Sequence, residues 1–165
     1  MSIRVGQGFD IHPFVADATD PVDRVLTLGG VAFPGETPLV GHSDADAVAH
    51  ACADALLGAA GLGDIGQHFP DTDPAWAGAD SLALLTEVTA RVGAAGWQPV
   101  NVDCTVVAER PKLAPHRDKM QRLLTAAVGA PVSVKATRAE GLGALGRAEG
   151  IACFAVALLE SKDSA

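Results

Sequence analysis

The chain has 165 residues, 48% of them hydrophobic, so we expect one domain over residues 1–165 with one ordinary core. The formal net charge of −8 and the absence of Tyr argue against nucleic-acid binding, which needs a basic surface and often aromatic stacking. No apolar run approaches the roughly 18–20 residues that span a bilayer, and the first residues lack a signal peptide's apolar stretch, so we expect a cytoplasmic protein that does not contact membranes.

The three cysteines, Cys52, Cys104 and Cys153, are spaced too widely for a disulfide framework or a CxxC zinc site. Cys52 and Cys104 lie in segments with a regular hydrophobic pattern. We therefore expect buried free thiols, which agrees with a reducing compartment.

The first part of the chain predicts a strand followed by a hairpin. Ile3–Phe9 has the composition of a strand, and Pro13 stops it shortly afterwards. Val25–Leu28 and Val31–Phe33 flank Gly29-Gly30, a pair that suits a tight two-residue turn.

Two helices are expected next, with a loop between them. Asp44 is the expected N-cap of a helix that runs to about Ala60 and closes at a glycine. Residues 66–78 are rich in Pro and Asp and predict a loop. Asp80 is the expected cap of the second helix, which runs through Arg91 with four residues at core spacing: Leu84, Leu85, Val88 and Val92.

The last part predicts three strands and a third helix. The strands are expected over Asn101–Ala108, Val132–Ala136 and Ile151–Leu159. The helix begins near Pro115, and its apolar stripe comprises Met120, Leu123, Leu124 and Ala127. This order predicts an α+β fold: a two-layer α/β sandwich with ferredoxin-like βαβ elements and helices on one face of a mixed sheet.

Two separate segments offer candidate metal ligands. Asp10 and His12 are two residues apart in an extended segment, so their side chains point to the same side. A lone Asp-x-His pair is more often a solvated loop pair, but His50 on the first helix adds a second imidazole. Two imidazoles and a carboxylate suit Zn²⁺, and three protein ligands leave a position open for substrate. We therefore consider Asp10, His12 and His50 candidate zinc ligands.

The helical segment around His50 has an unusual charge pattern. Asp46, His50 and Asp54 recur at every fourth residue, without the Lys and Arg that solvated helix faces usually contain. By itself this stretch fits a bound metal or ligand as well as it fits a solvated helix surface.

Two further segments have side chains that bind sugars or phosphates. Asp64–Asp73 holds acids and imidazoles that bind hydroxyls or a metal, although Asx-turns in a plain loop explain this segment better on its own. Lys135–Gly150 combines Lys135, Arg138 and Arg147 with glycines that let a phosphate approach the backbone. It lacks the Gly-Lys pair of a P-loop.

Four blocks of the sequence, taken in order, resemble the 2-C-methyl-D-erythritol 2,4-cyclodiphosphate synthase family. They are GFDIHPF, GHSDADAVAHACADALLGAAGLGDIGQHFPDTDP, NVDCTVVAERPKLAPH and RAEGIA, and the likeness runs from Val5 to about Leu159. The second block is long and highly specific. The resemblance implies a homotrimer of mixed α/β subunits, with the sheets facing the three-fold axis and each active site between neighbouring subunits.

The resemblance also implies a reaction. The substrate is 4-diphosphocytidyl-2-C-methyl-D-erythritol 2-phosphate, a small cytidine diphosphate compound. Its 2-phosphate attacks the β-phosphorus, CMP leaves, and a cyclic diphosphate forms. Intramolecular phosphoryl transfer needs positioning and charge neutralisation, which one Zn²⁺ per subunit and a second divalent cation, Mg²⁺ or Mn²⁺, supply.

Individual residues match the family's functional positions. Asp10, His12 and His50 match its zinc ligands, and Glu140 matches the residue that holds the second ion. The catalytic positions are those of His42, Thr137 and Arg138. The implied substrate contacts are Asp10, His12, His42 and Ser43 near the phosphates; Asp64, Ile65, Gly66, Phe69, Pro70, Asp71, Thr72 and Asp73 in the methylerythritol and ribose pocket; Ala108, Glu109, Arg110, Pro111, Lys112, Leu113 and Ala114 in the cytidine turn; Thr137, Arg138, Ala139 and Glu140 around the diphosphate; and Arg147, which matches an arginine near the three-fold axis.

The chain departs from the family at a few positions. The family usually has KATTTE where this chain has KATRAE, so Arg138 stands where a Thr contacts phosphate. Arg138 can reach the same phosphate, which we favour, or pair with an acid such as Glu140, or block the site. Ala144 and Ala148 replace a Phe and a Gly of the family's GFTGRGEG, which leaves isoprenoid-diphosphate binding at the trimer axis open.

Two other functions remain open from the sequence. A zinc phosphohydrolase would use the same ligands to activate water and would release CMP without a cyclic product. A non-catalytic trimeric protein would bind zinc and CMP without turnover, because of the changes within residues 138–148.

Overall fold

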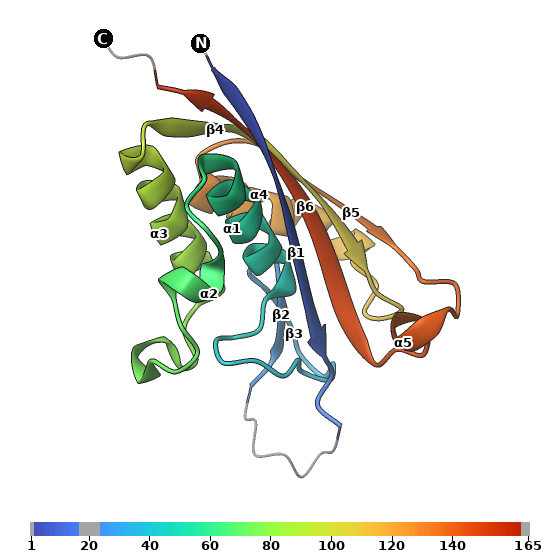
Figure 1. Ribbon diagram of the computed structural model, residues 1–165. Helices are drawn as coiled ribbons and strands as arrows, with labels where there is room; N and C mark the ends of the chain where they lie inside the picture. Colours follow the sequence, from blue (N-terminus) through green and yellow to red (C-terminus); the bar gives the residue numbers. More distant parts are fainter. Residues whose placement is uncertain (1, 17–23, 163–165) are drawn as a thin grey trace.

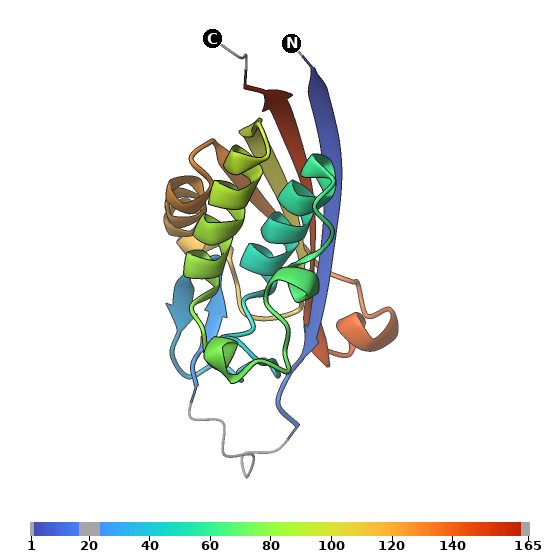
Figure 2. The same cartoon turned by 60° about the vertical axis from the view of Figure 1, so that its left-hand side comes forward.

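In the computed structural model, which describes residues 2–16 and 24–162, a four-stranded sheet is covered on one face by helices (Figures 1 and 2). The strands, in spatial order, are β1 (Ile3–Pro13), β6 (Gly150–Ser161), β4 (Trp97–Val107) and β5 (Val132–Thr137). β6 pairs antiparallel with both β1 and β4, whereas β4 and β5 are parallel. The expected mixed α/β architecture is therefore confirmed.

Three long helices form the second layer: α1 (Ala47–Ala60), α3 (Ser81–Ala94) and α4 (Arg117–Val128). The smaller elements are β2 (Leu26–Leu28), β3 (Val31–Phe33), α2 (Ile65–His68), η1 (Pro74–Trp76), η2 (Ala114–His116) and α5 (Gly143–Gly146). β4, α4 and β5 form one parallel βαβ unit. Within residues 2–16 and 24–162, none of the helices combines the length and apolar character that crossing a membrane requires.

Some element boundaries differ from the sequence prediction for identifiable reasons. β4 begins at Trp97 rather than Asn101, because a bulge next to Pro99 accommodates a residue that a regular ladder excludes. The third helix begins at Arg117, after the 3₁₀ turn that contains Pro115. The loop predicted over residues 66–78 contains α2 and η1, each capped by an aspartate, and the Gly-rich link contains α5.

The cap of α1 is Asp46, not Asp44 as the sequence suggested. The Asp46 side chain is fully buried and accepts hydrogen bonds of 2.7–3.1 Å from four backbone N–H groups, those of Gly29, Gly30, Val48 and Ala49. It therefore caps α1 and holds the turn of the β2–β3 hairpin at the same time. Asp44 accepts instead from the backbone N–H of Ser81, at the start of α3.

Helix α1 lies directly on the backbone of β1. A Cβ atom on Gly6 would overlap the carbonyl oxygen of Ala55, and one on Gly8 would overlap that of Ala51. Most of α1 is buried, and its alanines let it approach both the sheet and α3 closely. Because β1 has no side chain at Gly6 and Gly8, α1 packs directly on its backbone, and His50 lies close to the end of β1.

The face of the sheet opposite the helices is apolar along β1 and β6. Its exposed large apolar side chains are Ile3, Val5, Phe9, Ile11, Phe154 and Val156, with the polar Gln7 among them. The rings of Phe9 and Phe154 lie side by side, with centroids 4.8 Å apart. A contiguous apolar patch of this kind marks an interaction surface.

The core lies between the sheet and the helices. Leu84, Leu85, Val88 and Val92 are buried there as predicted, as are Met120 and Leu124 of α4, whereas Leu123 and Ala127 are half-buried against it. All three cysteines are buried free thiols, which confirms that prediction.

Candidate active site

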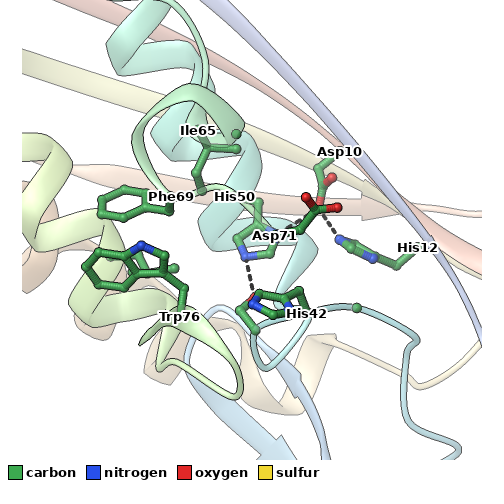
Figure 3. Close-up of a pocket in the computed structure, with 12 residues that line it drawn as sticks. Asp10, His12, His42, His50, Ile65, Phe69, Asp71 and Trp76 are labelled. Carbon is green, nitrogen blue, oxygen red and sulfur yellow. Dashed lines mark hydrogen bonds and ion pairs between the residues drawn. The ribbon is translucent and has the colours of Figure 1, made fainter. Parts of the chain in front are cut away.

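Asp10, His12 and His50 meet at the end of β1, where the first turns of α1 pass over the strand (Figure 3). One carboxylate oxygen of Asp10 lies 2.9 Å from Nε2 of His12 and 3.2 Å from Nδ1 of His50. The three potential ligand atoms lie within 4.8 Å of one another. The predicted ligand set is therefore assembled, and no other group of this kind occurs among the described residues.

The charges of these three side chains stabilise one another. Burial opposes ionisation of Asp10, but the hydrogen bonds and charges of His12 and His50 outweigh it and hold the pKa of Asp10 well below its ordinary value. Burial also disfavours the imidazolium of His12, but Asp10 outweighs it and raises the pKa of His12. A cation bound at this place would take over the pairing role of the imidazolium proton.

A cavity of about 350 Å³ opens beside the three ligands. His42, Ser43, Gly66 and Asp71 contribute polar groups and backbone to it, as predicted. Its far wall is apolar and is built from Ile65, Phe69, Trp76 and Leu84 (Figure 3). The sequence analysis missed Gly41, Trp76 and Leu84. Trp76 was detectable as a second large aromatic residue, after Phe69, in a polar loop, whereas Leu84 looked like an ordinary core residue.

The three ionisable residues that recur at every fourth position near α1, Asp46, His50 and Asp54, have separate roles. Only His50 joins the candidate ligands, because Asp46 is the buried cap of the helix. Asp54 accepts a hydrogen bond of 2.7 Å from the backbone N–H of Ile65 and so holds α2 against α1. The three residues therefore form neither a solvated surface nor a larger metal site.

The loop over Asp64–Asp73 is organised by its aspartates, as the Asx-turn interpretation predicted. Asp64 caps α2 through the backbone N–H of Gln67 (3.0 Å), and Asp73 caps η1 through that of Ala75 (2.9 Å). Of the predicted contacts in this segment, Ile65, Gly66, Phe69 and Asp71 line the cavity, whereas Asp64, Pro70, Thr72 and Asp73 do not.

A second cleft, of about 270 Å³, lies at the end of β5 and the turn after β4. The predicted residues that line it are Ala108, Glu109, Pro111, Lys112, Leu113, Ala114, Thr137 and Arg138. Arg117 and Ala136 line it as well and were not predicted. Arg110 points elsewhere: it donates to the hydroxyl of Thr37 (3.1 Å) and lies over the ring of Phe14.

Comparison with known proteins decides which family has these features. The sequence model of the YgbB family matches residues 3–160. The chain belongs to the YgbB family. A 2-C-methyl-D-erythritol 2,4-cyclodiphosphate synthase of Bordetella petrii is 57% identical over 159 residues, which cover 94% of each protein.

Solved structures of YgbB-like proteins have the same fold. The bifunctional IspDF of Campylobacter jejuni is 39% identical with a TM-score of 0.89, and the match covers 97% of this chain and 42% of that one. IspF of Plasmodium falciparum, in its CDP complex, is 33% identical with a TM-score of 0.82, and the match covers 98% of each chain.

Arg138, which stands where the family resemblance led us to expect a Thr, is paired with Glu109. Its Nε and Nη2 atoms lie 2.7 Å and 2.5 Å from one oxygen of that carboxylate. The other oxygen accepts from the backbone N–H of Ala139 at 2.9 Å. The partner is thus an acid of the turn after β4, and not Glu140, the acid that the sequence suggested.

The remaining predicted residues lie on the exposed link between β5 and β6. Glu140 has a left-handed backbone (φ 53°) and belongs to no group of metal ligands within the described residues. Arg147 pairs with Glu149 at 2.6 Å. Ala148, which stands where the family resemblance led us to expect a glycine, has a φ of 57°, a conformation that a glycine adopts without strain.

Proposed function

We propose that this protein converts 4-diphosphocytidyl-2-C-methyl-D-erythritol 2-phosphate into 2-C-methyl-D-erythritol 2,4-cyclodiphosphate and CMP, a step of the non-mevalonate isoprenoid pathway. The observation that carries the proposal is the group of Asp10, His12 and His50 beside a half-apolar cavity, in a chain 57% identical to a synthase of this name. The hydrolase and the non-catalytic binding protein have no comparable support.

The three ligands fit a zinc ion by their chemistry. Two imidazoles and one carboxylate are a common catalytic donor set for Zn²⁺, and three ligands leave one position for a phosphate oxygen. A zinc ion held there supplies a Lewis acid that neutralises phosphate charge. We further propose that Glu140 holds a second divalent cation, Mg²⁺ or Mn²⁺, together with the substrate's own phosphate oxygens.

The chain's own residues bind and orient the substrate. The apolar wall of Ile65, Phe69 and Trp76 accommodates the carbon skeleton of methylerythritol and keeps water away from the phosphates. Ser43 and His42 face the phosphates from the other side. The 2-phosphate oxygen forms a bond to the β-phosphorus, the bond to the α-phosphate bridging oxygen breaks, and CMP takes that oxygen away. No general base is needed, because the attacking phosphate is already ionised near pH 7.

The cleft at the end of β5 is the proposed cytidine site. It is lined by Ala108, Glu109 and residues 111–114 of the turn after β4, and it lies apart from the metal pocket on the same chain. A CDP complex of IspF from Plasmodium falciparum supports a cytidine diphosphate ligand. We propose that the metal pocket of one subunit and the cytidine cleft of its neighbour together form one active site.

This arrangement requires a homotrimer, which we propose from the apolar face of the sheet. Six apolar side chains of β1 and β6 are exposed on that face, and packing against other copies of the chain would bury them. We also propose a cytoplasmic enzyme with one domain. The ferredoxin-like description of the subunit remains a prediction.

We expect the purified protein to be a trimer by light scattering in the absence of substrate. Replacing Phe154 with Asp puts a charge opposite Phe9 in the apolar patch, so we expect it to produce monomers with little activity. Thr86→Asp, which adds the same charge on the exposed side of α3, away from this face, is the control and should remain trimeric. A monomer with full activity would contradict the shared site.

Arg138 tests whether the departure from the family matters for the reaction. Glu109 occupies the donors on one edge of the guanidinium, and the remaining N–H groups are free to bind a phosphate. We expect Arg138→Ala to lower kcat/KM about 10-fold and to make KM less sensitive to added salt. Arg138→Lys keeps the charge but not the planar guanidinium group, so its kcat/KM should lie between those of wild type and Arg138→Ala. Equal activity and salt sensitivity in all three proteins would show that Arg138 only pairs with Glu109.

The proposed function is tested by ³¹P NMR of the purified protein with the substrate, Zn²⁺ and Mg²⁺. The expected products are CMP and a cyclic diphosphate in equal amounts. CMP without the cyclic product would identify a phosphohydrolase. CMP binding without turnover would identify a non-catalytic binding protein.

A further inference from the structure

The back of the His50 ring, away from the ligand cluster, contacts a buried hydroxyl. Nε2 of His50 lies 2.8 Å from Oγ of Ser81, the first residue of α3, whose exposed fraction is only 1%. The same hydroxyl is hydrogen-bonded to the carboxylate of Asp44. A carboxylate, a hydroxyl and an imidazole therefore stand in line behind the proposed zinc position.

The hydrogen-bond donors and acceptors in this chain of contacts place a proton on Nε2 of His50. The Asp44 carboxylate accepts from the backbone N–H groups of Ser81 and Asp46, both at 3.1 Å, and an ionised carboxylate never donates. The one hydroxyl proton of Ser81 therefore goes to Asp44. Ser81 must then accept its bond with His50, so the ring proton of His50 lies on Nε2.

This tautomer leaves the lone pair of His50 where a metal needs it. Nδ1 faces the carboxylate of Asp10 at 3.2 Å and, without a metal, donates to it. A cation that replaces this proton finds the lone pair of Nδ1 directed at it, because the ring keeps its other proton on Nε2. His12 follows the same logic through the backbone, because its Nδ1 donates to the carbonyl of Val40 at 2.7 Å and leaves Nε2 free. Of these two histidines, only His50 has its tautomer set by side chains, so substitutions can test the effect.

We propose that Ser81 and Asp44 are positioning residues that fix the tautomer and ring orientation of His50 for cation binding. This inference rests on the proposed zinc site. Partners of this kind behind a ligating histidine commonly contribute 10–100-fold to metal affinity. Ser81 belongs to none of the motifs that the sequence analysis singled out, because its role depends on where α3 begins relative to α1.

A second hydroxyl limits the expected effect. Oγ of Ser43 lies 3.0 Å from Nε2 of His50 and accepts from the backbone N–H of Ala45 at 3.3 Å. Ser43 can therefore accept the hydrogen bond from the Nε2–H group of His50 when Ser81 is replaced, while its own hydroxyl proton stays available for a phosphate. We accordingly expect the loss in Ser81→Ala to be about 10-fold in zinc affinity, at the lower end of the range.

The test compares zinc affinity and ring protonation without substrate. Zinc dissociation constants are measured by competition with a chelator for wild type, Ser81→Ala, Asp44→Asn and Ser81→Thr. Thr86→Ala is the control, since its hydroxyl lies on the same helix but donates to the carbonyl of Leu82. Ser81→Ala and Asp44→Asn should bind zinc about 10-fold more weakly, Ser81→Thr should restore most of the affinity, and Thr86→Ala should match wild type.

The second readout is ¹⁵N NMR of the His50 ring. In zinc-loaded wild type, the proton should reside on Nε2 and the metal on Nδ1. Metal coordination through Nε2, or unchanged zinc affinity in both Ser81→Ala and Asp44→Asn, would overturn the inference. The wild-type spectrum decides the question even if a variant fails to fold. Because neither readout uses the substrate, a synthase failure in the ³¹P assay would leave this result interpretable, and the reverse also holds.

Discussion

Replacing His50 with alanine should lower the zinc content of the purified protein from about one ion per chain to a small fraction of that. The variant removes one of only three protein ligands, and the two that remain, Asp10 and His12, lie on one strand and leave the α1 side of the site without a ligand. We expect at least a 100-fold loss of zinc affinity, more than second-layer changes produce. Synthase activity should fall with it. Metal analysis of the dialysed protein measures the effect.

His116→Ala is the matched control for this experiment. It also removes an imidazole, but His116 packs against the ring of Phe33 and lies outside the ligand group. Its zinc content should equal that of wild type. Wild-type zinc content in His50→Ala would show that the ligand assignment is wrong, whatever the activity of the variant.

Replacing His42 with alanine should lower kcat by about 10²–10³-fold with a smaller change in KM. Nε2 of His42 lies 3.2 Å from the carbonyl oxygen of Asp73, which accepts its proton. We therefore expect Nδ1, which this contact leaves open, to face a phosphate of the bound substrate. Loss of one donor aimed at charge that develops in the transition state costs on the order of 10²–10³ in rate.

His42→Gln keeps a hydrogen-bond donor at this position. Glutamine can donate to a phosphate but lacks the imidazole ring, so its kcat should lie between those of wild type and His42→Ala. Steady-state kinetics with the cytidine diphosphate substrate measures both parameters. A raised KM with unchanged kcat in His42→Ala would assign His42 to binding that is equal in the ground and transition states.

The ligand group could be predicted from the sequence because each part of it depends on local geometry. Alternation along a strand puts Asp10 and His12 on one side, and an expected helix supplies His50. We predicted Asp44 as the helix cap, whereas the structure has Asp46. Both aspartates lie within one turn of the helix start, so the local sequence does not distinguish them. The choice depends on contacts with Gly29, Gly30 and Ser81, which are remote in the sequence.

The rest of the site depends on how distant elements pack. Leu84 and Ser81 enter it because the start of α3 lies against the start of α1, and no periodicity within α3 indicates this. Arg138 meets Glu109 because β4 and β5 are parallel neighbours whose ends lie side by side. The sequence alone does not show which acidic residue pairs with Arg138, because this depends on the order of the strands in the sheet.

The contact of α1 with the bare backbone of β1 has a consequence for how relatives of this chain should be judged. Gly8 leaves no side chain between strand and helix, so main-chain contact fixes the distance from His50 to Asp10 and His12. Main-chain atoms have no rotamers with which to absorb an added methyl group. A larger residue at Gly8 would therefore push α1 away from β1 and move His50 away from Asp10 and His12, although all three ligands would still be present in the sequence. A homologue with an intact ligand signature and a larger residue at this position should be suspected of having lost its metal.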